Sequence, residues 1–266
     1  MAEGRTVKKW LRFYMSGYEL GTNARSLGTA GWSYEESDQT AWQDTAHGYL
    51  PNHANISLGP FNGIYDTTAT TGLHAVASDP SNIPRDIMVP VGERAIPALG
   101  DPTFCARLMQ LGYQTDTSGD VVNIPFGPWD VDDLMTPFGQ PWGHLLHIKE
   151  SEAAVNTSDT DNVDSYSGAA TSEGGYFMHQ IFSITGAGTV TLSVEDSPDQ
   201  DNANFLPIAG GCTTAAIATA AAPTSGIIRT TVASAAVRRW TRWQIAFGGG
   251  ATACEFALAF VRGRAS

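Results

Sequence analysis

The sequence is poor in charged residues, and its cations are fewer than its anions. Only 16% of its 266 residues are Asp, Glu, Lys or Arg, and the 27 acidic residues outnumber the 15 basic ones, for a formal net charge of −12. Because phosphate backbones select cationic surfaces, this balance argues against general nucleic-acid binding. A solvated acidic surface, or an acidic conduit that repels DNA, is compatible with it.

Cysteine and long apolar runs are also scarce. The three cysteines, Cys105, Cys212 and Cys254, lie far apart among small or apolar residues, so we expect buried free thiols rather than a disulfide framework. No stretch approaches the ~18 apolar residues of a membrane span. The charged start of the sequence lacks the apolar segment of a secretory signal. We therefore expect a protein that is made in the cytoplasm and works without a membrane.

Motifs of catalysis and nucleotide binding are missing as well. The chain contains no G-x-S-x-G, no H-E-x-x-H, no P-loop and no G-x-G-x-x-G sequence. A catalytic triad assembled from distant histidines and serines would leave no trace in the sequence. Because none of the four motifs is present, we expect no enzymatic activity, no catalytic residue and no cofactor.

Two stretches carry residue types that bind metal ions. His144, His147 and Glu150 follow an H-x-x-H-x-x-E spacing, which on a helix would place all three on one face. On a strand, His144 and His147 point to opposite faces, and because we interpret His144–Lys149 as a strand, we predict no metal site there. Asp159–Asp164 holds three carboxylates but lacks the Gly and Glu of a calcium loop. A solvated linker is the favoured interpretation of that stretch, and calcium binding stays open.

Alternation of apolar and polar residues is the main positive signal. In Gly174–Asp196, two alternating segments flank Gly186–Gly188, whose glycines tolerate a tight turn, so this stretch predicts a β-hairpin. Trp240–Phe247 and Cys254–Phe260 alternate in the same way around three glycines. A lone hairpin is marginal in water, so these later segments are its expected partners in an antiparallel β-domain.

The pattern divides the chain into two β-rich domains joined by a polar segment. Residues 1–155 show short strands and at most one short helix, within residues 67–79. Residues 156–172 are nearly all small or polar and are interpreted as a linker. Residues 173–266 carry about seven short strands, which predicts an immunoglobulin-like or jelly-roll β-sandwich. The predicted fold class is all-β and mainly antiparallel, with a barrel or sandwich domain followed by a second sandwich.

Aromatic residues beside polar segments are the candidates for an interaction surface. Trp and Tyr are enriched in protein interfaces, and they also stack on sugars. In a chain so low in charge, a subunit interface is the favoured use. Glu35–Leu50 is polar and lacks apolar alternation, which predicts an exposed loop that becomes ordered on assembly. The candidate interface residues are Trp32, Trp42, His47 and Tyr49.

The order of these segments resembles the major tail (tail tube) protein of long-tailed bacteriophages. The N-terminal similarity rests on Lys8–Tyr14, Tyr34–Ser37, His47–His53 and Ala54–Asp66. The C-terminal segments Val190–Ser197, Val237–Trp240 and Phe256–Arg262 resemble the immunoglobulin-like β-domains that phages add to such proteins. The chain departs from the family at Thr67–Ser78, where the amphipathic helix expected between the tube strands is weakly represented.

The resemblance implies a virion structural protein of the phage tail, assembled in the host cytoplasm. It implies homo-hexameric rings that stack into a tube, contact other tail proteins and conduct DNA during ejection without binding it. Since fixed cations would retain phosphates, we expect an acidic lumen, with Asp116, Asp120, Asp130 and Asp132 as candidates for its wall. The alternatives are a capsid decoration or head-fibre protein and a module that binds host-surface glycans.

Overall fold

The computed structural model describes residues 11–38, 49–79, 84–92, 96–119, 122–127, 129–130, 137, 140–153, 162–164 and 171–263. Every strand pair within these ranges is antiparallel, and the one α-helix among them is short, so the predicted all-β fold class is confirmed. The strands form one large sheet and three smaller ones. Short 3₁₀ turns lie at Gly21–Asn23, Asn202–Asn204 and Thr219–Ala221.

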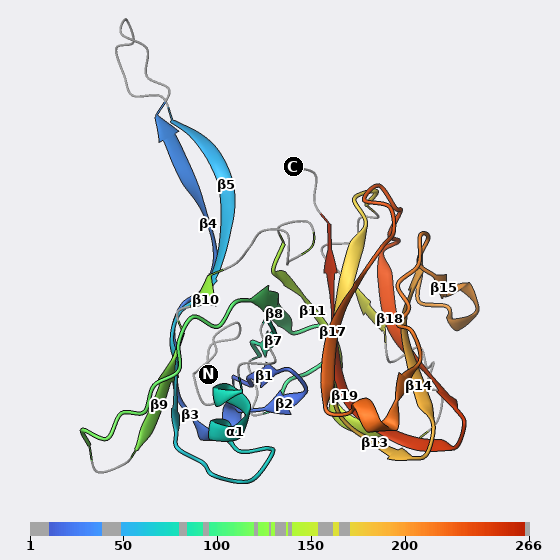
Figure 1. Ribbon diagram of the computed structural model, residues 1–266. Helices are drawn as coiled ribbons and strands as arrows, with labels where there is room; N and C mark the ends of the chain where they lie inside the picture. Colours follow the sequence, from blue (N-terminus) through green and yellow to red (C-terminus); the bar gives the residue numbers. More distant parts are fainter. Residues whose placement is uncertain are drawn as a thin grey trace, which may run out of the picture.

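The large sheet has eight strands and combines segments from both ends of the chain (Figure 1). They are β1 (Tyr14–Met15), β2 (Tyr18–Glu19), β7 (Arg85–Pro90), β8 (Pro102–Leu108), β11 (Trp142–Glu152), β13 (Gly175–Gly186), β17 (Thr224–Arg229) and β19 (Ala251–Arg262). Their order in the sheet is β17-β13-β19-β11-β8-β7-β1-β2. β11, which precedes residues 156–172, is hydrogen-bonded to β19, which follows them, so strands from both sides of this segment belong to one sheet. The division into two domains there stays a prediction.

A second sheet packs on the C-terminal end of the large sheet. Its path is β12 (Asn162–Asp164), β18 (Trp240–Gly248), β14 (Thr189–Ser197) and β15 (Leu206–Pro207), with β16 (Ile217–Ala218) also paired to β14. Leu192 and Trp243 from this sheet meet Phe177 and Phe256 from the large sheet in one buried core. The alternation in β14 reflects this arrangement, because one of its faces is turned toward that core.

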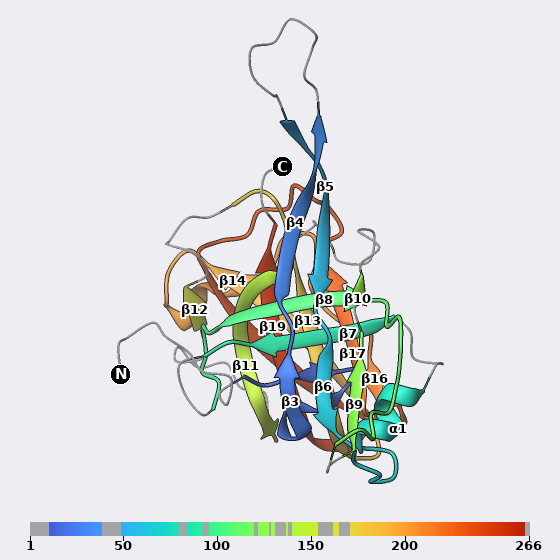
Figure 2. The ribbon, with the colours of Figure 1, turned by 90° about the vertical axis from the view of Figure 1, so that its left-hand side faces the viewer.

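The N-terminal end of the large sheet is covered by two three-stranded sheets and the helix (Figure 2). One sheet joins β3 (Ala24–Leu27), β6 (Phe61–Ile64) and β9 (Asn123–Phe126), and the other joins β10 (Trp129–Asp130), β5 (Tyr49–Leu58) and β4 (Ala30–Asp38). The helix α1 (Leu73–Ser78) lies within the stretch predicted to be helical and buries Leu73, Val76 and Ala77. Phe61 and Phe104 belong to the second core that these elements enclose.

β13 and β14 do not form the hairpin that the sequence predicts. β13 pairs with β17 and β19, whereas β14 pairs with β18, so the two strands belong to different sheets. The turns at Gly186–Gly188 and Gly248–Gly250 both carry the chain from one sheet to the other. Their backbones meet so closely that a Cβ at Gly188 would lie 2.1 Å from the carbonyl oxygen of Gly248.

Burial on both sides of β13 explains this difference. Phe177 and Ile181 enter the first core, between the large sheet and the second sheet. Tyr176 and Met178 enter a third core on the concave side of the large sheet. A strand with two apolar faces needs cover on both, which a hairpin with β14 would not have provided. Pairing β14 with β18 instead places the two sheets face to face across the first core.

The large sheet curls until strands from its two ends come into contact. Gln180 on β13 accepts a hydrogen bond from the backbone N–H of Gly17 at 2.7 Å and donates one to the carbonyl oxygen of Asp86 at 3.0 Å. Ser225 on β17 donates to the Asp86 carboxylate at 2.9 Å, and Arg107 contacts the same carboxylate at 2.6 Å. Gln180, the polar exception in the apolar pattern of β13, thus links strands that are not neighbours in the sheet.

Candidate functional site

A two-stranded arm, defined by β4 and β5, projects from the body of the molecule (Figures 1 and 2). The two strands pair from Ala30 opposite Leu58 at the base to Asp38 opposite Tyr49 at the described end. β10 pairs with β5 only at Leu58 and Ser57. Beyond that base, the arm strands in the described part of the chain are hydrogen-bonded to each other alone.

The arm corrects the prediction of a loop over the whole of Glu35–Leu50. Glu35–Asp38 continue β4, and Tyr49 and Leu50 begin β5, so the prediction is wrong at both ends. These strand ends could not be predicted from the sequence because their polar residues do not alternate with apolar ones. An arm that extends away from the core needs no apolar face. Residues 39–48 lie outside the described residues.

The four candidate interface residues all belong to the arm or to the segment between its strands. Trp32 lies on β4 opposite Ile56, and Tyr49 lies on β5 opposite Asp38. Trp42 and His47 lie outside the described residues. The structure thus assigns Trp32 and Tyr49 to one projecting element, and their role in subunit contact stays a prediction.

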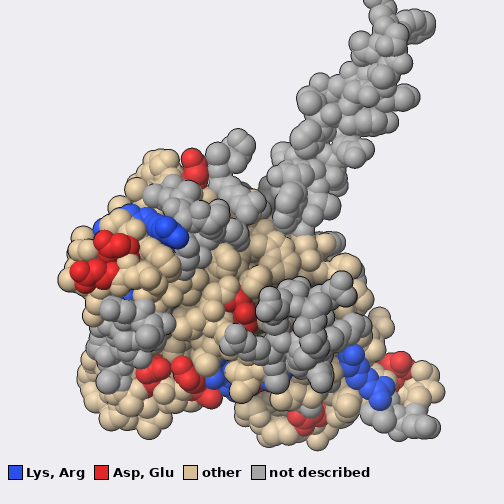
Figure 3. Space-filling view, turned by 180° about the vertical axis from the view of Figure 1, so that it is seen from behind, with Lys and Arg blue, Asp and Glu red and all other residues tan. Residues whose placement is uncertain are grey.

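The four lumen candidates are described only in part. Asp116 is partly exposed and pairs with Asn123 in an isolated bridge, and hydrogen bonds from Ser118 hold the pKa of its carboxyl below the usual value. Asp130 lies on β10 opposite Ser57, at the base of the arm. Asp120 and Asp132 lie outside the described residues. From behind, the described surface is mostly uncharged, with acidic and basic side chains in small groups (Figure 3). The acidic lumen stays a prediction.

The cysteines are the buried free thiols that the sequence predicts. Burial raises the pKa of Cys212 and of Cys254 to about 12 and that of Cys105 further still. Thiols with such pKa values are inert as nucleophiles and as metal ligands at neutral pH.

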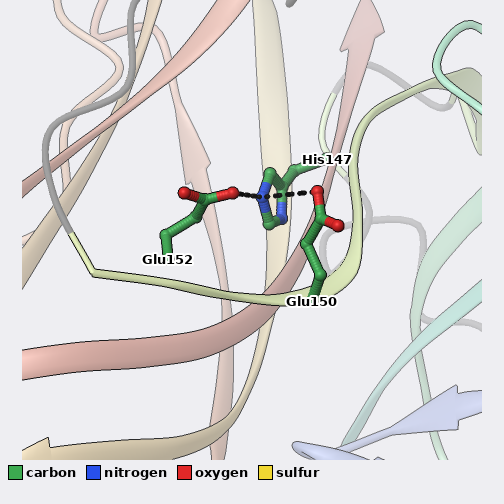
Figure 4. Close-up of side chains that lie close together, drawn as sticks. All are labelled: His147, Glu150 and Glu152. Atoms are coloured by element: carbon green, nitrogen blue, oxygen red, sulfur yellow. Dashed lines mark hydrogen bonds and ion pairs between the residues drawn. The ribbon is translucent and has the colours of Figure 1, made fainter.

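Within the described residues, one group of three potential metal ligands occurs, formed by His147, Glu150 and Glu152 of β11 (Figure 4). His147 Nε2 lies 3.3 Å from Glu152 Oε1 and 3.8 Å from Glu150 Oε1. The three donor atoms all lie within 4.8 Å of one another. The imidazole is buried, whereas the Glu150 side chain is 52% exposed, so the group opens toward solvent.

A β-bulge brings these side chains together. His147 pairs with Leu258 and Glu150 with Phe256, so three steps along β11 match two steps along β19. The extra residue changes the face on which the following side chains lie, which brings His147 and Glu150 to the same side. The strand prediction for His144–Lys149 is confirmed, but sequence alternation alone could not place the bulge. His144 is not part of the group, and its Nδ1 lies 2.9 Å from the carbonyl oxygen of Gly100.

The imidazole of His147 is held by two aromatic rings and a backbone carbonyl. It stacks on Phe256 with ring centroids 3.9 Å apart and an interplanar angle of 7°. Trp243 meets the same imidazole edge to face at 4.5 Å. His147 Nδ1 lies 3.1 Å from the carbonyl oxygen of Phe256. Beside the ring is a cavity of about 240 Å³, lined by His147, Glu150 and Glu152 together with Ile148, Trp243 and Pro97–Leu99.

Comparisons with known proteins give a weak structural likeness. No protein-family model and no curated protein sequence matches the chain. One solved structure with similarity is the 6-fold symmetrised anti-feeding prophage baseplate, with a TM-score of 0.36 and 11% sequence identity; the match covers 47% of this chain and 91% of that chain. Another is the SPP1 Dit protein, of the hub adsorption apparatus in phages that infect Gram-positive bacteria, with a TM-score of 0.32 and 11% identity; the match covers 95% of this chain and 99% of that chain. A third is the phage P2 baseplate in its activated conformation with Ca (TM-score 0.30, 8% identity, 95% and 98%). TM-scores this low do not establish a common fold.

No helix among the described residues is long and apolar enough to cross a membrane.

Proposed function

We propose that this chain is a ring-forming structural protein of a bacteriophage tail, and that it forms the stacked hexameric rings of a tail tube. The proposal rests on the sequence resemblance and on one structural observation, the projecting arm of β4 and β5. The baseplate and hub proteins named above belong to the same kind of assembly, but their TM-scores are too low to add weight. The role of the arm is to contact the neighbouring subunit.

The arm is the element that favours assembly, because beyond its base its two strands pair only with each other among the described residues. β4 has nine residues, so the arm extends over about 30 Å. A two-stranded ribbon is marginally stable in water, and its outer edges present unpaired backbone N–H and C=O groups. In a closed ring each arm lies against the next subunit, which covers those edges and repeats the same contact around the symmetry axis.

Shortening the arm tests the proposal. Residues Glu36–Pro51, which begin and end at a paired position, are removed and replaced by an Asn-Gly turn. The shortened protein should keep the β-sheet circular dichroism spectrum of the wild type but remain a monomer in sedimentation velocity. Negative-stain micrographs of the wild type should show rings or tubes with sixfold symmetry.

The control is a Gly-Ser-Gly insertion between Ala233 and Ser234, in an exposed turn of the body, which should leave assembly intact. Rings or tubes formed by the shortened protein would show that the arm is not the assembly contact. Threefold or fivefold particles from the wild type would replace the tail proposal with a capsid decoration role.

A further inference from the structure

We propose that His147, Glu150 and Glu152 bind a divalent transition-metal ion of the Zn²⁺ type (Figure 4). This site is independent of the arm and of the proposed role in the tail. All three ligands belong to one strand, on either side of the bulge in β11. The ion would therefore fix the conformation of that bulge.

The spacing of the donor atoms matches the coordination shell of such an ion. Zn²⁺ binds imidazole nitrogen and carboxylate oxygen at about 2.0–2.2 Å, so two ligands of a tetrahedral site lie about 3.4 Å apart. The distances from His147 Nε2 are 3.3 Å to Glu152 Oε1 and 3.8 Å to Glu150 Oε1. An ion placed among the three atoms needs only small side-chain rotations, and the more exposed Glu150 can provide them.

The orientation of the imidazole is that of a metal ligand. The Phe256 carbonyl oxygen can only accept a hydrogen bond, so its contact with His147 Nδ1 requires the proton on that nitrogen. In the neutral ring Nε2 then carries the lone pair, and this atom lies 3.3 Å from Glu152 Oε1 and 3.8 Å from Glu150 Oε1. Three electron-rich atoms within 4.8 Å of one another are stabilised by a cation between them. A hydrogen bond from the second ring nitrogen to a backbone carbonyl is also the usual support of a metal-binding histidine.

The surroundings of the group favour metal binding because they fix the orientation of the His147 imidazole before an ion binds. Phe256 and Trp243 hold the imidazole plane, so little rotamer freedom remains to be lost on binding. The adjoining cavity leaves room for a water molecule as a further ligand. One imidazole with two carboxylates suits Zn²⁺, Co²⁺ or Mn²⁺ better than Ca²⁺ or Mg²⁺, which prefer oxygen ligands.

The competing explanation is a second proton on His147, which would make an imidazolium paired with the two carboxylates. Metal titration separates the two explanations. The full chain, without an affinity tag and treated with a chelator, is titrated at pH 7.5 with Zn²⁺ by calorimetry and with Co²⁺ by visible absorption. We expect one site per chain with a dissociation constant in the micromolar range. We also expect a Co²⁺ spectrum of four- or five-coordinate type and little competition from millimolar Ca²⁺.

Variants of the two glutamates identify the site while leaving the contacts of the buried ring with Phe256 and Trp243 in place. The double variant E150Q/E152Q should weaken Zn²⁺ binding at least 100-fold. Glu255→Gln changes a partly exposed carboxylate on the adjacent strand β19 and should leave binding unchanged. At a 100-fold excess of Zn²⁺ over its dissociation constant, the melting temperature of the wild type should rise by about 5–10 °C.

Three results would overturn the proposal. They are the absence of any Zn²⁺ site tighter than about 1 mM, binding that persists in E150Q/E152Q, and ¹⁵N shifts of His147 that show both ring nitrogens protonated at pH 7.5 and unchanged by Zn²⁺.

Discussion

The side-chain amide of Gln180 on β13 donates a hydrogen bond to the backbone carbonyl of Asp86 on β7, although the two residues are 94 positions apart and their strands are not neighbours in the sheet. The same side chain accepts from the N–H of Gly17. One buried amide thus satisfies two backbone groups at the place where the large sheet curls back on itself.

Replacing Gln180 by leucine should therefore destabilise the fold. The substitution keeps the approximate size of the side chain but leaves the buried N–H of Gly17 without this partner, and the carbonyl of Asp86 then accepts, among the described residues, only from the N–H of Ser16. We expect a loss of about 3 kcal/mol in the free energy of unfolding, measured in urea. Gln244→Leu, at a partly exposed position of β18, is the control and should change stability by less than about 0.5 kcal/mol. Equal effects of the two changes would mean that Gln180 does not hold the curl.

The turn between β13 and β14 should tolerate no side chain at Gly188. A Cβ there would lie 2.1 Å from the carbonyl oxygen of Gly248 and 2.4 Å from the amide nitrogen of Ala251. Both are backbone atoms of the neighbouring turn, so Gly188→Ala must separate the two turns. We expect a loss of several kcal/mol, or no folded protein. Gly119→Ala, where nothing lies within 4 Å, should be close to neutral in thermal unfolding. A stable Gly188→Ala variant would contradict the observed approach of the two turns.

His179 should make stability depend on pH between about 4 and 6.5. Burial lowers the pKa of His179 from 6.5 to about 4, the Asp86 carboxylate opposes this shift, and Arg107 adds to it. In this interval the unfolded chain binds a proton that the folded chain does not, so stability is complete above pH 6.5 and falls as the pH approaches 4. The loss attributable to this group is about 3 kcal/mol.

Urea unfolding of the wild type and of His179→Gln over this pH range tests that prediction. Glutamine does not titrate, so the variant should lose less stability on acidification, even if it is less stable at pH 7.5. Carboxylates titrate in both proteins, and the difference between the two curves isolates the histidine. Parallel curves would show that His179 is not the responsible group.

The proposed conduit predicts that added positive charge in the lumen retains DNA. Asp116→Lys replaces a partly exposed carboxylate among the lumen candidates. Assembled tubes of this variant should bind double-stranded DNA at 50 mM salt and release it at 500 mM, whereas wild-type tubes should bind it at neither. Gln200→Lys, exposed in the region expected to face outward, is the control. Equal DNA binding by both variants, or an inner wall lined mainly by Arg and Lys, would contradict the conduit.

Alternation in the sequence predicted the positions of several strands and of the helix. The strand stretches Trp240–Phe247 and Cys254–Phe260 lie within β18 and β19, and the helix within residues 67–79 is α1. Alternation reports which side chains share a face but not which strand lies alongside, so it could not distinguish a hairpin from a turn between two sheets at Gly188.

The group of His147, Glu150 and Glu152 shows a second limit of the sequence. The strand assignment of His144–Lys149 was right, yet the group forms because one extra residue in β11 shifts the register against β19. The bulge depends on pairing with a strand more than a hundred positions later, as the His147 contact with Phe256 shows. The outer ends of the arm strands, Glu35–Asp38 and Tyr49–Leu50, were missed for a different reason, since polar strand ends that extend away from the core show no apolar alternation.

The position of β19 in the large sheet constrains the order in which the protein can fold during synthesis. β19 begins at Ala251 and lies between β13 and β11, both of which the ribosome makes well before it. Until it emerges, β11 and β13 each present an unpaired edge, and the two halves of the sheet remain separate. Folding must therefore be completed late and through long-range contacts, which makes it slow. The unpaired edges of β11 and β13 thus expose the nascent chain to aggregation during that interval.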